Sequence, residues 1–245
     1  MKNPNRTYTA NIAFISFLLL SVMSCKTYQV PIDGAPKIGQ IYMTNEVNFK
    51  NEDQIKYLGS GFLVKYENAF YACTAKHIVT KTKRLTHSIK ATELNDSMKN
   101  WAMFPRYKEQ KTVELGLLIN DDEMDSEWWV LEVEKASKFN KAIEIREKAA
   151  EVGEQVFFVG CPYTQTDCKQ NIYVGKIESI LNDKIRINYD PKINVAGFSG
   201  AALMDKDGKL IGMLTQATWD KKKKVHTIVW AESTKVLKEV LKGVD

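Results

Sequence analysis

The sequence predicts an all-β fold with one helix at the C-terminal end. Residues 235–241 carry apolar side chains at helical spacing, directly after Ser233-Thr234, which supplies an N-cap candidate. Before them, short apolar segments recur along the chain with polar turns in between, a pattern typical of antiparallel strands. These segments are residues 39–43, 57–64, 70–74, 101–107, 112–120, 128–133, 154–160, 171–177, 184–189, 210–214 and 225–231. Residues 134–150 form a polar connection, rich in lysine and glutamate, with a partly helical pattern.

The most informative stretch for function is residues 197–203, Gly-Phe-Ser-Gly-Ala-Ala-Leu. Ser199 stands between two glycines in a tight turn that leads into a strand. Its hydroxyl can therefore be exposed while neighbouring backbone N–H groups converge on one point. This arrangement suits a nucleophile beside an oxyanion hole. The alternative is a purely structural turn, because turns of small residues are common between strands.

A serine nucleophile needs a general base, which is usually histidine. The chain has three histidines. His77 follows a strand that ends in small residues, and it is the candidate base. His87 lies in a polar, lysine-rich segment and is expected to be a solvated loop residue. His226 stands in the last strand, where it either packs or faces a specificity pocket.

Three segments resemble the trypsin-like serine peptidases of the chymotrypsin fold. They are Gly-Ser-Gly-Phe-Leu-Val at 59–64, Thr-Ala-Lys-His at 74–77 and the serine stretch at 197–203. The resemblance is greatest to the bacterial HtrA-type branch, here without a PDZ domain, and it covers most of residues 39–241. It implies a peptidase domain at residues 39–245 made of two six-stranded antiparallel β-barrels. The barrels would span about residues 39–133 and 154–232, with a helix at 233–242 packed on the second barrel.

The same resemblance implies a carboxylate that orients His77, placed just before the segment Trp-Trp-Val-Leu-Glu-Val at 128–133. Trypsin-like enzymes have aspartate there, but this sequence has Glu127. The longer side chain must fold back to reach the same imidazole nitrogen. Asp125 is the alternative acid if a bulge shifts the register by two residues; the remaining alternative is that both are surface charges of an acidic turn. The order His77, Glu127, Ser199 is that of chymotrypsin-like enzymes.

The resemblance also assigns groups that would bind a substrate. The N–H groups of Gly197 and Ser199 would form the oxyanion hole. Asn194 belongs to the stretch 190–197 that would form the wall of the primary specificity pocket, and Phe198 is expected on the substrate side. The strand edge that would pair with an extended peptide backbone contains Thr215, Gln216 and Ala217.

These residues imply a serine endopeptidase that hydrolyses peptide bonds of exported or envelope proteins, with a polypeptide as its partner. Two alternatives stay open. One is a pseudoprotease that keeps the fold and binds a peptide or protein without cutting it, and the other is a lipid-anchored structural β-domain. No metal, nucleotide or other cofactor is implied, because the histidines do not fall at metal-ligand spacing and no glycine-rich phosphate loop is present.

Residues 1–24 are predicted to be a targeting segment rather than part of the fold. They combine two basic residues, no acidic residue and an apolar core at 12–23 that is too short to span a membrane as a mature helix. The sequence Val-Met-Ser-Cys at 22–25 is similar to the lipobox of bacterial lipoproteins. It implies lipidation of Cys25, a tether at 25–38 and a domain held at a membrane, in the periplasm or at the cell surface. The alternative is an ordinary cleaved signal peptide.

Export to an oxidising compartment would allow a disulfide between Cys161 and Cys168, which flank one loop, and would leave Cys73 as a buried free thiol. Without the predicted targeting segment, which carries two basic residues, the formal net charge falls from +5 to +3, a mildly basic balance that does not indicate nucleic-acid binding. The lysine run at 221–224 is expected to be a solvated hairpin tip. Contact with anionic lipid head groups is the weaker alternative.

Overall fold

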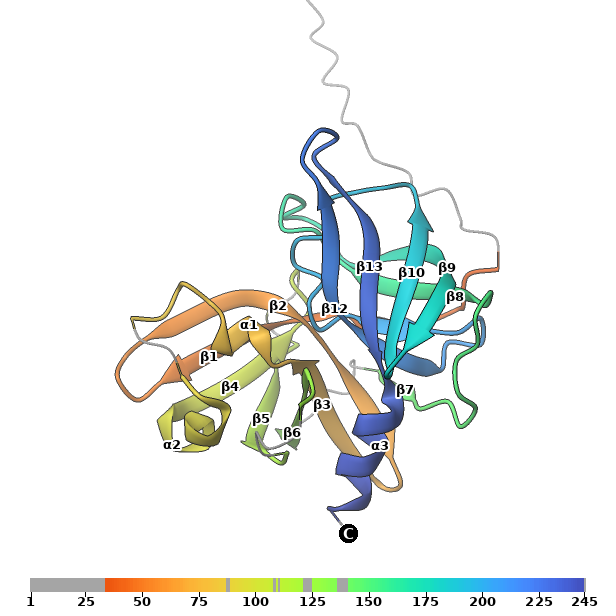
Figure 1. The fold of residues 1–245 in the computed structure, drawn as a ribbon. Coiled ribbons are helices and arrows are strands. Elements are labelled where there is room, and N and C mark those ends of the chain that lie inside the picture. Colours follow the sequence, from red (N-terminus) through yellow and green to blue (C-terminus); the bar gives the residue numbers. More distant parts are fainter. Residues whose placement is uncertain are drawn as a thin grey trace, which may run out of the picture. The chain divides into compact units, whose positions relative to one another are not determined.

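A computed structural model of the chain describes residues 34–86, 89–107, 109, 111–120, 125–135 and 141–244. The predicted targeting segment and Cys25 lie outside the described residues, as does His87. The described part folds as two β-barrels, each a closed ring of six antiparallel strands (Figure 1). Within the described ranges, no helix has the length and apolar character that crossing a membrane requires.

The first barrel is built from the N-terminal strands. They are β1 (Met43–Phe49), β2 (Gln54–Tyr66), β3 (Ala69–Ala75), β4 (Met98–Phe104), β5 (Val113–Leu118) and β6 (Trp128–Lys135). Around the ring the order is β1-β4-β5-β6-β3-β2, and pairing between β1 and β2 closes it. Closure satisfies the strand edges that an open sheet would leave unpaired.

The second barrel follows the same plan. Its strands are β8 (Gln155–Gly160), β9 (Asn171–Leu181), β10 (Lys184–Asp190), β11 (Ala202–Met204), β12 (Leu210–Asp220) and β13 (Val225–Ser233). The closed order is β10-β13-β12-β11-β8-β9. Figure 1 shows the long β12–β13 hairpin extending beyond the end of this barrel. The predicted fold class, two six-stranded antiparallel barrels with a C-terminal helix, is confirmed.

The connection between the barrels differs from the expected partly helical segment. β6 continues as far as Lys135, and a short strand, β7 (Ala142–Glu144), pairs with β2 in parallel orientation. Ile143 of β7 lies opposite Val64 and is 4% exposed. The segment is extended although its residues have a partly helical pattern. The extended backbone buries Ile143 against the first barrel, and this packing outweighs a weak helix propensity.

One regular helix, α3 (Thr234–Lys242), follows β13, and Ser233 caps it by accepting a hydrogen bond from the N–H of Lys235. The helix was expected to pack on the second barrel, but it contacts β6 of the first barrel as well as β12 of the second. Its buried apolar face consists of Leu237, Val240 and Leu241. The other helical segments among the described residues are single turns: α1 (His77–Thr80), η1 (Ala91–Glu93) and α2 (Leu94–Ser97).

Each barrel encloses an apolar core. In the first, Trp101 and Trp129 are buried and pack edge to face with ring centroids 5.8 Å apart. In the second, the ring of Phe158 stacks on Tyr173 and meets Tyr189 edge-on, both at 5.4 Å. Each fully buried aromatic ring of this kind contributes roughly 2–3 kcal/mol of hydrophobic stabilisation. The cores therefore give two rigid frames on which the intervening loops are held.

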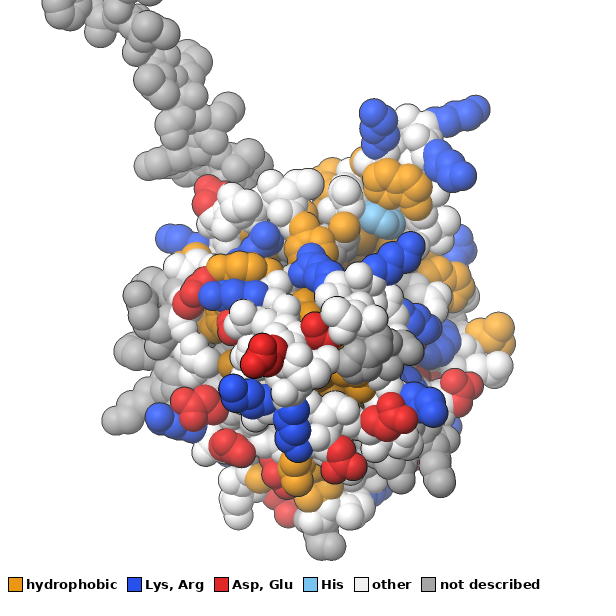
Figure 2. All heavy atoms as spheres, turned by 90° about the vertical axis from the view of Figure 1, so that its left-hand side faces the viewer, with side chains coloured by type: hydrophobic (Ala, Val, Ile, Leu, Met, Phe, Trp, Pro, Cys, Tyr) orange, Lys and Arg blue, Asp and Glu red, His pale blue; other side chains and the backbone are white. Residues whose placement is uncertain are grey.

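Acidic and basic side chains are interspersed over much of the face shown in Figure 2. Near the top of that view, basic side chains gather beside apolar side chains and a histidine. The lysines at 221–224 are all exposed, and no ion pair between described residues involves them. They form a solvated tip of the β12–β13 hairpin.

Candidate active site

β3 and β6 place His77 next to Glu127. These strands pair antiparallel with Ala75 opposite Trp128, so the end of β3 and the start of β6 lie at the same end of the sheet. The N–H of Lys76 donates to the carbonyl of Glu127 over 2.8 Å, which continues the pairing by one step. His77 begins α1 directly afterwards. The register of two strands therefore determines that these side chains meet.

Ser199 comes from the second barrel, in the turn before β11. Its carbonyl accepts a hydrogen bond of 2.8 Å from the N–H of Ser60 in β2. The hydroxyl of Ser60 donates to the carbonyl of Gly197 over 2.7 Å, and the N–H of Gly200 donates to a carbonyl in β12 over 2.8 Å. These bonds tie the turn to both barrels and bring Ser199 to His77 although 122 positions separate the two in the chain.

His77 lies between the carboxylate and the hydroxyl. Its Nδ1 is 2.7 Å from Oε2 of Glu127, and its Nε2 is 2.8 Å from Oγ of Ser199. A carboxylate at Nδ1 favours the tautomer that carries its proton there, so the lone pair of Nε2 faces the serine hydroxyl. In this arrangement the imidazole can accept the proton of Ser199.

Glu127 is ionised at neutral pH. Burial alone would raise the pKa of its carboxyl group, since only 15% of the side chain is exposed. The hydrogen bonds and charge of His77 outweigh burial, and Lys81, with Nζ 3.6 Å from Oε1, adds a smaller effect. Together they lower the pKa of Glu127 from 4.5 to about 2.

The structure brings Glu127, rather than Asp125, to His77. Asp125 is exposed and has no hydrogen bond or ion pair to His77. Glu127 reaches the imidazole because its side chain folds back over the partner, and Oε2 also accepts a 3.1 Å hydrogen bond from the backbone N–H of His77. The extra methylene of glutamate is thus accommodated without a shift of register.

The backbone before Ser199 sets the direction of the Gly197 N–H group. The carbonyl of Ala196 accepts a 3.0 Å hydrogen bond from the N–H of Tyr163. Carbonyl and N–H of one trans peptide point in opposite directions, so the N–H of Gly197 is turned away from Tyr163. It has no hydrogen-bond partner in the part of the chain that the structure describes.

The N–H of Ser199 is set in the same way. The carbonyl of Phe198 accepts from the N–H of Ala201 over 2.8 Å, which turns the N–H of Ser199 to the opposite side of that peptide. Within the described ranges this N–H also lacks a hydrogen-bond partner. The turn therefore holds two unpaired backbone donors, those of Gly197 and Ser199, close to the serine hydroxyl.

Two glycines are required by this turn. Gly197 has φ +105° and Gly200 has φ +89°, in the left-handed region that side chains with a Cβ rarely adopt. A Cβ at Gly200 would lie 2.1 Å from the carbonyl oxygen of Ser60, an impossible contact. At Gly197 it would lie 3.2 Å from the ring of Tyr163. The close approach of the two barrels at Ser60 depends on the missing side chain at 200.

The loop that supports Gly197 is closed by a disulfide between Cys161 and Cys168. Tyr163, inside this loop, connects the two barrels, because its hydroxyl accepts a 2.7 Å hydrogen bond from the N–H of Gly59 in β2. The third described cysteine, Cys73, is fully buried, and burial raises the pKa of its thiol. Cys73 is therefore a packed, unreactive side chain.

A cavity of about 170 Å³ lies beside Ser199. Residues 195–199 form one wall, residues 214–217 form another, and His226 and Val229 of β13 complete it. None of these lining residues is acidic. A positively charged side chain entering the cavity would find no counter-charge among them.

His226 lines this cavity as a neutral imidazole. Its Nδ1 accepts a 3.0 Å hydrogen bond from the N–H of Val195, so the ring proton is on Nε2. The ring of Trp219 packs against it at an angle, with centroids 4.8 Å apart. Burial lowers the pKa of His226, which keeps the neutral form at pH 7. His226 thus supplies an N–H donor rather than a positive charge.

The remaining sequence-predicted residues divide into two groups. Thr215, Gln216 and Ala217 line the cavity, as a substrate-binding strand would. Asn194 does not line it; its side chain accepts a 3.0 Å hydrogen bond from the N–H of Ala196 and shapes the turn.

Phe198 was expected on the substrate side, and the structure corrects this. Phe198 borders the cavity, but it is only 1% exposed. Its ring packs against the rings of Phe158 and Tyr173, with centroids 6.0 and 5.4 Å away. The space is provided by Gly160, where a Cβ would lie 2.6 Å from the ring. The ring is inside because burying a whole aromatic side chain is more favourable than exposing it at a turn.

Two residues that hold the site together, Tyr163 and Glu232, were not predicted from the sequence. Tyr163 gave no local signal, since its partners are Gly59 and Ala196. Glu232 did carry a signal: it is an acidic residue in the otherwise apolar segment Ile-Val-Trp-Ala-Glu at 228–232. A buried carboxylate in a strand needs a specific partner, and here the partner is the N–H of Glu127 at 2.8 Å.

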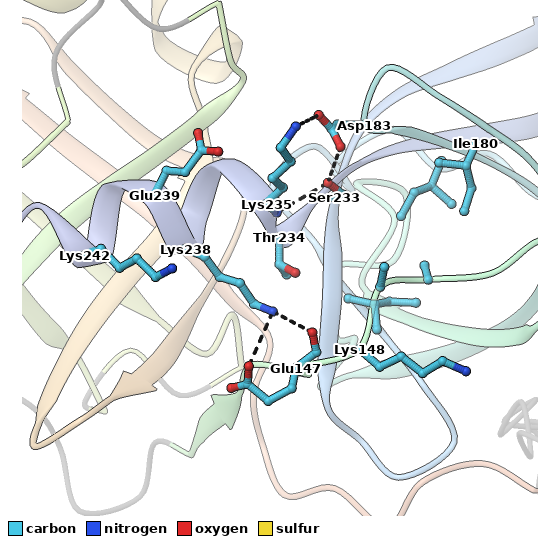
Figure 3. A pocket seen from close by; sticks show the side chains of 14 residues that line it. Glu147, Lys148, Ile180, Asp183, Ser233, Thr234, Lys235, Lys238, Glu239 and Lys242 are labelled. Atoms are coloured by element: carbon cyan, nitrogen blue, oxygen red, sulfur yellow. Dashed lines mark hydrogen bonds and ion pairs between the residues drawn. The ribbon is translucent and has the colours of Figure 1, made fainter.

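A larger cavity, of about 350 Å³, lies beside α3 and shares no lining residue with the cavity at Ser199 (Figure 3). Two lysines at its rim are neutralised by ion pairs, Lys235 with Asp183 and Lys238 with Glu147. Within the described ranges, no cluster of three or more His, Cys, Asp or Glu residues could hold a metal ion.

Residues 59–213, more than half of the chain, match the family described as trypsin-like peptidase domain. The chain belongs to this family, and its fold is that of a trypsin-like serine protease. No curated protein sequence matches it.

Solved structures share the fold at low sequence identity. The active form of the Rv3671c protease from Mycobacterium tuberculosis is similar with a TM-score of 0.57 and 14% identity, over 83% of this chain and 80% of that one. The serine endoprotease from Yersinia pestis has a TM-score of 0.57 and 21% identity, over 88% of this chain and 68% of that one.

Proposed function

We propose that this chain is a serine endopeptidase that cuts polypeptides through Ser199, His77 and Glu127. The observation that carries the proposal is the position of one imidazole, 2.7 Å from a carboxylate oxygen on one side and 2.8 Å from a serine hydroxyl on the other. An exposed structural turn would not need this alignment, which joins residues from both barrels.

In the proposed reaction Ser199 Oγ attacks the carbonyl carbon of a peptide bond while His77 Nε2 takes the hydroxyl proton. Glu127 keeps the imidazole oriented and stabilises its positive charge. The N–H groups of Gly197 and Ser199 bind the oxyanion, an interaction worth about 3 kcal/mol for each donor. His77 then protonates the leaving amine, and Ser199 is left acylated. Water attacks the acyl carbon while His77 takes a proton from it, and His77 returns this proton to Ser199 Oγ as the acid product leaves.

The substrate is proposed to bind as an extended strand. Beyond Leu214, β12 is paired with β13 on one side, and residues 214–217 line the cavity on the other. A peptide backbone can add to that edge, and the side chain before the cut bond can enter the 170 Å³ cavity. The absence of an acidic lining residue favours uncharged side chains there over lysine or arginine.

The proposal also restricts the substrates to exported or envelope proteins. This restriction rests on the predicted signal at residues 1–24 and on the predicted lipid attachment at Cys25, which would hold the domain at a membrane. Metabolic labelling with a radioactive fatty acid, compared between the chain and Cys25→Ala, tests it. We expect label on the chain and none on Cys25→Ala. Equal labelling of the two would contradict the anchor.

A fluorophosphonate probe tests the catalytic proposal, because it reacts with activated serines. The full chain, purified in detergent, is compared with Ser199→Ala and His77→Ala, and His87→Ala serves as the matched histidine control. We expect labelling of the chain and of His87→Ala but not of the other two. A folded chain that neither reacts with the probe nor cuts unfolded protein substrates would favour the alternative, a binding protein with a peptidase fold.

A further inference from the structure

Glu232 is a buried carboxylate on β13 with both oxygens in use. The residue is 2% exposed. Its Oε2 accepts a 2.8 Å hydrogen bond from the backbone N–H of Glu127, and its Oε1 lies 3.1 Å from Nζ of Lys184, its cross-strand neighbour on β10. A buried charge is tolerated only with such partners. Of these two polar contacts, the one with Glu127 reaches the first barrel.

That contact is the second of two hydrogen bonds that hold the main chain of Glu127 in place. On one side its carbonyl accepts from the N–H of Lys76, the residue before His77. On the other side its N–H donates to Glu232. Both polar backbone groups of Glu127 are therefore held, one by the first barrel and one by the second.

A glutamate at this position depends on these two backbone hydrogen bonds more than an aspartate would. Its side chain has one more rotatable bond, so a fixed backbone is required before the carboxylate can be held at one position. The adjacent contact, a 3.0 Å hydrogen bond from Nε1 of Trp128 to the carbonyl of Ser233, already docks the two barrels at this point. The carboxylate of Glu232 is thus not needed for docking alone, but it is the group that fixes the direction of the Glu127 N–H.

We propose that Glu232 is a positioning residue, which holds Glu127 so that its carboxylate meets Nδ1 of His77. It acts from the second barrel on an acid of the first, and it touches neither substrate nor reacting atoms. The inference rests on the proposed function for its kinetic consequence only; the geometric claim concerns the Glu127–His77 contact itself.

The test compares Glu232→Gln, which keeps an oxygen acceptor, with Glu232→Leu, which removes it. Glu178→Leu is the matched control, because Glu178 makes a cross-strand ion pair with Arg186 of β10 but does not contact the site. Activity is measured as kcat and KM per active site, counted with the fluorophosphonate probe. We expect Glu232→Leu to lower kcat about 10- to 100-fold with KM nearly unchanged, since small misplacements of a catalytic group have effects of this size. Glu232→Gln and Glu178→Leu should stay within about 3-fold of the unmodified chain.

A second measurement does not depend on activity. In histidine-labelled protein, the Nδ1 proton of His77 gives an NMR signal that reports its hydrogen bond to Glu127. We expect this signal to be kept in Glu232→Gln and shifted or lost in Glu232→Leu. If the chain does not react with the probe, the proposed function fails while this signal still tests Glu232.

A third measurement needs no variant, in case Glu232→Leu does not fold. Hydrogen exchange of the Glu127 amide in the unmodified chain should be slow, because the N–H is bonded to a buried carboxylate. Exchange as fast as that of an exposed loop amide would overturn the inference. So would a Glu232→Leu protein with unchanged kcat and an unchanged His77 signal.

Discussion

The carboxylate of Glu127 contacts His77 twice through the same oxygen. Oε2 lies 2.7 Å from Nδ1 of the ring and accepts a 3.1 Å hydrogen bond from the backbone N–H of the same residue. The two contacts close a small ring that fixes the imidazole relative to its own main chain. This geometry shows how a glutamate reaches the imidazole nitrogen at the position where trypsin-like enzymes have aspartate, and it leads to the first two predictions.

Shortening or neutralising this acid should reduce activity by different amounts. Glu127→Gln keeps the length but no longer stabilises the charged imidazole, and we expect kcat to fall about 10³- to 10⁴-fold, as loss of the acid does in such triads. Glu127→Asp keeps the charge but not the reach, and we expect roughly a 10-fold loss. Asp125→Asn is the control and should be unchanged. A fully active Glu127→Gln protein would contradict the assigned role.

Acid should destabilise the fold through the same residue. The pKa of Glu127 is about 2 in the folded protein against 4.5 for a free side chain, so the folded state favours the ionised form. Its stabilising effect is present above pH 4.5 and is lost as the pH falls toward 2. The loss is at most about 3 kcal/mol, and less after solvent screening. Urea unfolding of the chain and of Glu127→Gln between pH 5 and 3 should show converging stabilities.

A methyl group at Gly200 should disrupt the site. Its Cβ would lie 2.1 Å from the carbonyl oxygen of Ser60, and φ of +89° disfavours any side chain. We expect Gly200→Ala to cost more than about 2 kcal/mol of stability and to abolish probe labelling. Gly243→Ala is the control, because a Cβ there would meet its nearest atom at an ordinary 3.5 Å. Thermal unfolding and labelling of both variants decide the matter.

Removing the disulfide should affect the turn at residues 196–200 more than the barrels. The 161–168 loop holds Tyr163, whose N–H fixes the peptide before Gly197. Without the disulfide this short loop is no longer closed, and the free energy of unfolding should fall by about 2–3 kcal/mol. We expect the double variant Cys161→Ala, Cys168→Ala to lose about 10-fold in kcat while keeping its fold by circular dichroism. Unchanged acylation rates would show that Tyr163 stays in place without the disulfide.

The cavity beside Ser199 should discriminate against positive charge. No lining residue is acidic, and burial lowers the pKa of His226, which keeps its imidazole neutral at pH 7. We expect fluorogenic peptides with lysine or arginine before the cut bond to have kcat/KM values at least about 10-fold below those with an uncharged side chain, because a charge would be buried without a partner. Preferred cleavage after lysine or arginine would contradict this assignment of the cavity.

Much of the fold could be predicted from the sequence, because its signals are local. Strands show as short apolar segments between turns, and the helix shows as apolar spacing after Ser233. Ser199 between its glycines and His77 at the end of a strand were recognisable for the same reason. The segment at 142–144 was not, since its extended form depends on pairing with β2, which lies far away in the sequence.

The sequence by itself indicated the strands, the serine and the histidine, because strand patterning and turn chemistry depend on neighbouring residues, and its resemblance to the trypsin-like peptidases implied the two barrels. Only the tertiary structure brought Glu127 rather than Asp125 to His77, placed the ring of Phe198 in a core, and joined Glu232 to Glu127. These outcomes depend on side-chain reach and on contacts between distant segments, 105 positions apart for Glu232 and Glu127. Such contacts form only when the two closed barrels pack together. The residues of one short segment do not indicate which distant residue will lie beside it.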